Sequence, residues 1–148
     1  MRMRRFLPNE DGVAAIEFAF IGPVLAMVLL GGFSGWSYLR QVGDMRGAVE
    51  TVAKYYILGG ASETVANTIG TETWFNKPGG GAITASRQNK CGNTNVSSTT
   101  WVCPDGNQSQ TYVTILATST WANPVQSDWL GIFPGTIAVQ HSEVVRVR

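Results

Sequence analysis

The sequence has few of the residues that carry out chemistry. Charged side chains make up 14% of its 148 residues, and it holds one histidine and two cysteines. A typical soluble domain has about 25% charged residues. The formal net charge of +1 gives no support to nucleic-acid binding. No CxxC pair and no phosphate-loop lysine motif occurs, so we expect no metal, no cofactor and no small-molecule substrate.

The one histidine, His141, lies on a predicted strand. A hydrolase needs a nucleophile and an orienting carboxylate beside its histidine. Ser142 and Glu143 are sequence neighbours, but adjacent residues of a strand point to opposite faces. We therefore predict that the protein is not an enzyme and that His141 is a structural or surface residue.

Apolar residues are abundant near the N-terminus. Residues 13–36 contain a single charge, Glu17, and a helix of this length spans ~36 Å. A hydrocarbon core is ~30 Å thick. Arginines occupy positions 2, 4 and 5, and positive residues stay on the cytoplasmic side. We predict a basic cytoplasmic leader over residues 1–12, a transmembrane helix over 13–38 and an external domain over 39–148.

A removable secretory signal is the alternative interpretation of the apolar run. Small residues at positions 32 and 34 would suit a signal-peptidase site. Glu10 and Asp11 directly before the run, Glu17 inside it and its length all argue against this alternative.

The N-terminal motif combines a basic leader, Gly12, and Glu17 at the fifth position after that glycine. The sequence blocks are RRFL at 4–7, GVAAIEFA at 12–19 and IGP at 21–23. This pattern resembles the TadE-like family, pilin-like minor proteins of the tight-adherence (Flp-type) pilus system. The resemblance covers about 20 residues, and the rest of the chain carries little signature.

The resemblance implies cleavage by a prepilin peptidase after Gly12, which would make Val13 the new N-terminus. Valine departs mildly from the family's usual residue at that position. In a packed bundle, Glu17 of one subunit would pair with the Val13 amine of a neighbour, because charges in a low dielectric are tolerated when paired. The alternative is that Glu17 is protonated or reaches toward the cytoplasmic interface without a partner.

The family implies a single-pass protein of the bacterial inner membrane that takes part in pilus assembly. Its N-terminus would be cytoplasmic and its C-terminal domain periplasmic, with export into a surface pilus left open. The implied partners are the prepilin peptidase, other pilin-like subunits and the assembly machinery. Two alternatives remain: an uncleaved membrane-anchored external binding module, and a type II secretion pseudopilin. N-terminal sequencing separates the first alternative from the pilin-like interpretation.

Four glycines, Gly31, Gly35, Gly43 and Gly47, follow four-residue steps, with Leu39 in the remaining slot. This spacing keeps them near one face of a helix, where small residues permit close approach of a partner helix. The alternative is a helix made flexible by glycine.

The remaining chain predicts an α+β, pilin-like fold. An amphipathic helix over 39–58 should continue the membrane helix and pack on a small antiparallel sheet over about 82–148. A short second helix is expected over about 62–75, starting at Ser62 and Glu63. Strands are expected at 82–88, 111–121 and 136–147, with Glu143 interrupting the alternation of the last, as at a bulge or an edge.

Cys91 and Cys103 bracket a loop rich in Asn, Ser, Thr and Gly. On the external side of a bacterial membrane the surroundings are oxidising, which favours a disulfide between them. Two buried free thiols are the alternative.

Overall fold

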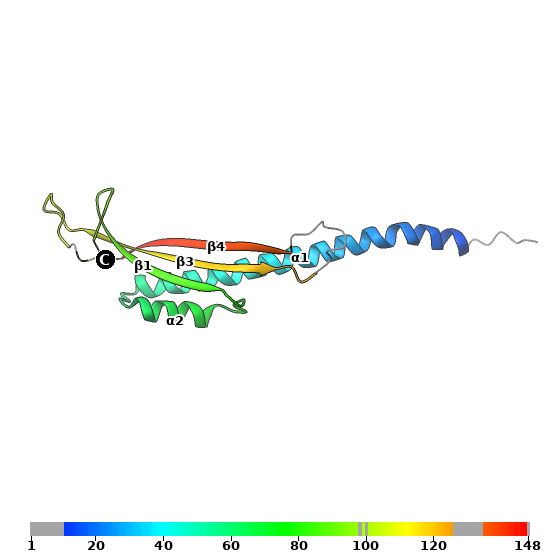
Figure 1. Cartoon of the computed structure of the whole chain (residues 1–148), viewed down its shortest axis with the longest axis horizontal. Coiled ribbons are helices and arrows are strands. Elements are labelled where there is room, and N and C mark those ends of the chain that lie inside the picture. The colour runs from blue at the N-terminus through cyan, green and yellow to red at the C-terminus, as the bar shows by residue number, and fades with distance from the viewer. Residues whose placement is uncertain (1–10, 98, 100, 126–134, 148) are drawn as a thin grey trace, which may run out of the picture. The chain divides into compact units, whose positions relative to one another are not determined.

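The computed structural model describes residues 11–97, 99, 101–125 and 135–147, with side chains from residue 15 onward. Two helices precede four strands, so the fold is α+β as predicted (Figure 1). The chain divides into two compact units, Met1–Trp36 and Ser37–Arg148; the second unit is called the head below. Helix α1 (Asp11–Ile57) contributes residues to both units.

Helix α1 begins at Asp11, two residues before the helix start expected from the sequence, and includes Pro23. Its C-terminal end is a glycine cap. The Gly60 N–H donates to the Tyr55 carbonyl at 2.9 Å, and Gly59 adopts a φ of 95°. Glycine reaches this left-handed conformation without steric cost, so the helix stops at the Gly59-Gly60 pair.

Helix α2 (Glu63–Thr73) starts at an N-cap serine. The Ser62 hydroxyl accepts a hydrogen bond from the Val65 N–H at 3.3 Å, which satisfies one of the free donors at the helix start. Gly70 of α2 is buried. A Cβ at Gly70 would lie 2.8 Å from Ile83 and 2.9 Å from Val52, so the glycine permits the close approach of α2 to its neighbours.

The four strands are β1 (Ala82–Cys91), β2 (Thr94–Val96), β3 (Gln110–Ala122) and β4 (Thr136–Val147). They form one antiparallel sheet in the order β2-β1-β3-β4. The predicted antiparallel sheet is therefore confirmed, and it gains the short strand β2. Gly92, with a φ of 59°, lies in the turn that joins β1 to β2. That local hairpin lacks the alternation of apolar residues from which strands are recognised.

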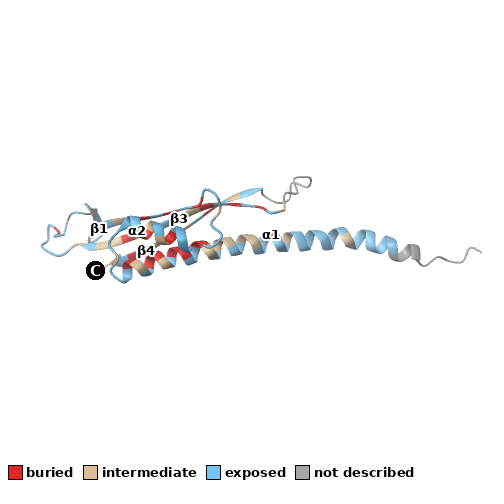
Figure 2. Cartoon of the chain, turned by 90° about the horizontal axis from the view of Figure 1, so that it is seen from below, coloured by how far each residue is buried: buried red, intermediate tan, exposed pale blue. Residues whose placement is uncertain are grey.

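The division after Trp36 separates a first half of α1, residues 11–36, from a second half, residues 37–57. The hydrophobic core lies between the second half of α1, α2 and one face of the sheet (Figure 2). Met45, Val49 and Val52 of α1 are almost fully buried, as are Val113 and Ile115 of β3. Two side-chain hydrogen bonds also join α1 to β3. The Trp121 indole N–H donates to the Ser37 hydroxyl at 3.3 Å, and the Gln41 amide donates to the Ser119 hydroxyl at 3.1 Å.

Strand β2 pairs only with the last three residues of β1, which leaves the rest of that edge without a neighbouring strand. Helix α2 covers this part of the edge. The Asn67 amide oxygen accepts the Ala85 N–H at 2.9 Å, and a Glu63 carboxylate oxygen accepts the Arg87 N–H at 3.1 Å. These side chains replace the hydrogen bonds that a neighbouring strand would make. Covering an edge in this way prevents unwanted pairing with other chains.

Strand β4 forms the other edge of the sheet. Each of its residues pairs in continuous register with β3 from Thr136 to Val147, so Glu143 lies at a sheet edge and not in a bulge. Glu143 pairs with Ile115 and His141 with Ala117, which places both polar residues on the core-facing side at partial burial. Inward-pointing polar residues on an edge strand discourage edge-to-edge association.

Candidate functional site

Large apolar side chains are exposed along α1 between Ile16 and Trp36. Figure 2 shows this part of the helix mostly in the pale blue of exposed residues. Phe20 is 75% exposed and Val28 is 65% exposed. The helix is long and apolar enough to cross a membrane, judged by length and composition, and none of its most apolar window is buried within the structure. Side chains of this kind are stable in hydrocarbon and costly in water, about 25 cal/mol per Å² of apolar surface. This part of α1 is built to contact an apolar environment.

Glu17 lies on this segment, and its side chain is exposed. In the part of the chain that the structure describes, the ion pair found joins Lys54 and Glu50, and Glu17 takes part in none. A carboxylate in an apolar segment needs a partner or a proton. Within the described residues that partner is not supplied by this chain.

Gly12 and Val13 lie in the first turn of α1, directly after its start at Asp11. Most of the basic leader, residues 1–10, falls outside the described residues. The spacing of Gly12, Val13 and Glu17 along one helix places the glutamate about one turn beyond Val13. Cleavage after Gly12 stays a prediction.

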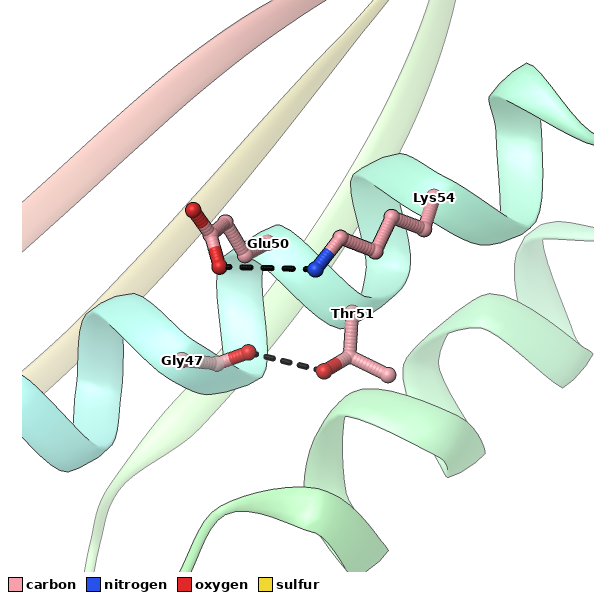
Figure 3. A network of polar contacts seen from close by, with 4 residues as sticks. All are labelled: Gly47, Glu50, Thr51 and Lys54. Atoms are coloured by element: carbon pink, nitrogen blue, oxygen red, sulfur yellow. Dashed lines mark hydrogen bonds and ion pairs between the residues drawn. The ribbon is translucent and has the colours of Figure 1, made fainter.

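The four glycines predicted to form a packing face all lie on α1. Gly35, Gly43 and Gly47 are exposed, and a Cβ at any of the three would meet nothing within 4 Å. Gly31 is half-buried. In the head, Gly43 and Gly47 therefore lie away from the core-facing residues such as Met45 and Val49. Figure 3 shows the neighbouring exposed groups, with the Thr51 hydroxyl donating to the Gly47 carbonyl at 2.8 Å.

Cys91 and Cys103 form a disulfide, with Cα atoms 5.6 Å apart and a sequence separation of 12. This confirms the predicted pairing over the alternative of free thiols. The bridge ties the end of β1 to the loop that precedes β3. It closes a polar segment that has little apolar material of its own with which to fold.

Trp101, next to this disulfide, is a residue that the sequence pattern did not single out. Its side chain is 68% exposed, whereas the Trp121 and Trp74 side chains are buried. A tryptophan between polar residues gives no periodic signal that separates an exposed from a buried position. Its exposure depends on how the loop folds over the end of the sheet.

His141 is half-buried on β4, and Ser142 points to the opposite face of the sheet. Ser142 therefore does not lie beside His141 and Glu143 on the core-facing side of β4. Among the described residues, no group of three or more His, Cys, Asp or Glu side chains is placed to hold a metal ion.

Residues 12–54 match the family model described as TadE-like protein. No curated protein and no solved structure gives a significant match to the chain. The matched range begins at the predicted processing glycine and runs through the exposed apolar part of α1 into the core-facing part. The chain therefore carries, over residues 12–54, a segment similar to the TadE-like family, as its N-terminal motif predicted.

Proposed function

We propose that this protein is a minor, pilin-like subunit of a tight-adherence pilus system that acts by assembly in the membrane. The proposal rests on the overlap between the family match and the exposed apolar part of α1. The TadE-like match over residues 12–54 covers the exposed apolar half of α1, which contains Glu17 close to its start. The head adds a folded, disulfide-bonded domain to that helix.

Processing follows from this proposal: a prepilin peptidase cuts after Gly12, and Val13 becomes the N-terminal residue. The test is N-terminal sequencing of the chain extracted from membranes of cells that contain the peptidase. We expect the wild type to start at Val13 and a Gly12→Val variant to keep its leader. A Gly22→Ala variant is the control, because a Cβ there makes only ordinary contacts, 3.7 Å from the Phe18 ring. A wild-type chain that keeps Met1 in such cells supports the membrane-anchored binding module instead.

Glu17 then sets the axial register between neighbouring helices by pairing with the Val13 amine of another subunit. Its lack of an ion pair within the described chain supports an external partner. A Glu17→Gln variant keeps the shape and removes the charge, so we expect normal processing and reduced recovery of assembled subunits. Glu50→Gln makes the same chemical change at an exposed site, where the glutamate pairs with Lys54 among the described residues. Equal recovery for Glu17→Gln and the wild type would refute the charge-pair role.

The glycine face supplies the close contact that the same assembly needs. Open space at Gly35, Gly43 and Gly47 supports a partner helix approaching there. Gly35→Leu should lower recovery of assembled subunits and leave the head folded. Leu39→Ala, one step along the same face, removes bulk and should be tolerated.

The proposal places the N-terminus in the cytoplasm and the head in the periplasm. The Cys91–Cys103 disulfide supports an oxidising location for the head. Protease treatment of spheroplasts tests this orientation: the head should be degraded without permeabilising the membrane. Protection of the head until the membrane is opened would reverse the orientation.

A further inference from the structure

A groove lies at the end of the sheet where the disulfide-bonded loop meets strands β3 and β4. Its volume is about 530 Å³, and it is called the tryptophan groove below. Its lining includes Trp101, Gln108, Ser109, Gln110, Thr111 and Arg146. Among the described residues that line it, none has a carboxylate. None of these residues belongs to α1.

The backbone that carries Trp101 is fixed from several sides. The Ser109 N–H donates to the Trp101 carbonyl at 3.0 Å, and Val102 forms a β-bridge with Gln108. The Cys103 N–H donates to the Asn107 carbonyl at 2.8 Å, and Cys103 is bonded to Cys91. The backbone position of Trp101 is therefore preorganised, which lowers the ordering entropy lost when a ligand packs on its side chain.

Some of the polar side chains that line the groove are held by hydrogen bonds within the protein. The Tyr112 hydroxyl donates to the Gln110 amide oxygen at 2.8 Å, which orients that amide and leaves its NH₂ group as a donor. The Thr111 hydroxyl donates to the Asn89 amide oxygen at 2.8 Å. The groove thus offers a flat aromatic face together with amide and hydroxyl groups. Sugar rings match this combination, because their C–H faces pack on an indole and their hydroxyl groups bond to amides.

The charge near the groove is positive. Arg146 lines it, and in the described part of the chain the structure gives Arg146 no ion pair. The ammonium of Lys90, on the same end of the sheet, lies 5.2 Å from the centre of the Tyr112 ring. The loop contains an acidic residue, Asp105, whose carboxylate accepts hydrogen bonds from the Asn107 backbone and side-chain N–H groups at 3.1 and 2.9 Å. Asp105 does not line the groove.

We propose that the tryptophan groove binds an acidic sugar chain, one whose rings carry carboxylates. Trp101 packs against a ring, the Gln108 and Gln110 amides bond to hydroxyl groups, and the Arg146 guanidinium pairs with a carboxylate, for which its planar fork is suited. Protein interfaces also favour aromatic and Arg side chains, so a protein contact is the competing outcome of the test below. The lining here is mostly amide, hydroxyl and guanidinium.

The test is calorimetric titration of the full chain in a detergent without a sugar headgroup. The probe is a galacturonate hexasaccharide, and its methyl-ester form is the matched neutral probe. We expect the acidic form to bind at least about tenfold more tightly than the ester. Trp101→Ala should weaken binding of both probes, and Arg146→Gln should remove the preference for the acid.

Two control variants separate a built site from general stickiness. Phe75→Ala removes another exposed aromatic ring, and Arg46→Gln removes another exposed positive charge. Both should bind the acidic probe like the wild type, and circular dichroism should show every variant folded. The proposal is overturned by no binding of the hexasaccharide, by equal binding of acid and ester, or by equal losses in the control variants. Loss of subunit assembly in Trp101→Ala without any sugar binding assigns the groove to a protein contact instead.

Discussion

The two halves of α1 differ in what covers their apolar side chains. In the first half, Met27 is 41% exposed and Val28 is 65% exposed. In the second half, Met45 is 1% exposed and Val49 is fully buried in the core of the head. The second half also carries five charged residues on its wetter positions: Arg40, Asp44, Arg46, Glu50 and Lys54.

This difference shows that a helix can be apolar for two separate reasons. In the first half, the apolar surface extends around the helix, as expected of a segment that faces lipid or other helices. In the second half, apolar residues follow a stripe that matches one face of the sheet. The helix is continuous between Asp11 and Ile57, so hydrogen bonding along the backbone does not mark the change.

The largest effect is expected when a methionine side chain is removed from the buried half of α1, compared with the same substitution in the exposed half. Met45→Ala leaves a cavity in the core and should lower the free energy of unfolding of the head by about 2–5 kcal/mol. Met27→Ala is the matched control and should leave head stability unchanged. The measurement is urea unfolding in a fixed concentration of detergent, followed by near-ultraviolet circular dichroism. Equal losses for the two variants would contradict the separation of α1 into two halves.

A smaller effect is expected at two glycines with opposite surroundings. Gly70→Ala forces a Cβ against Ile83 and Val52, and this overpacking should cost about 1–3 kcal/mol of head stability. Gly47→Ala places its Cβ in open space and should raise head stability by up to about 1 kcal/mol through helix propensity. The same urea titration measures both. A destabilising effect of Gly47→Ala would place a contact on the glycine face within this chain.

The next prediction concerns Tyr56, a core residue of the second half. Burial raises the pKa of its phenol above 10.0, and its hydroxyl has no hydrogen-bond partner among the described residues. In the unfolded chain the phenol loses its proton first, so head stability should fall as the pH rises from 10 toward the folded pKa.

Tyr56→Phe removes both the titration and the unpartnered hydroxyl. At neutral pH we expect this variant to be as stable as the wild type or slightly more stable, because no hydrogen bond is lost. Its stability should fall less steeply above pH 10. Parallel pH profiles of the two proteins would show that Tyr56 is not the group responsible.

The smallest effect is expected on the exposed face of the second half. The Lys54 Nζ and Glu50 Oε2 atoms lie 3.6 Å apart (Figure 3). The two residues are one helical turn apart, and both side chains are mostly exposed. Such pairs contribute roughly 0.3–0.5 kcal/mol. Lys54→Ala should therefore change the urea midpoint of the head only slightly, and added salt should reduce the difference. A loss as large as that of Met45→Ala would show that this face is not solvent-exposed.

The alternation of β3 was predictable, because Val113, Ile115 and Ala117 occupy every second position. The glycine cap and the Ser62 N-cap were also predictable, since each depends on residues close together in sequence. The exposure of Trp101, the inward position of Glu143 and the covering of the β1 edge by Asn67 and Glu63 were not. Each of these depends on a contact between segments far apart in the chain.

The sequence by itself determined the membrane-length apolar helix, the spacing of Gly12, Val13 and Glu17, and the α+β class. These features are patterns of residue type at short, regular spacing, which backbone geometry converts directly into faces and turns. Only the tertiary structure decided that Trp101 is exposed, that Asn67 and Glu63 cover the edge of β1, and that a groove forms beside Trp101. Those outcomes depend on the register and docking of distant segments, where many side chains pack together and no single local pattern fixes the result.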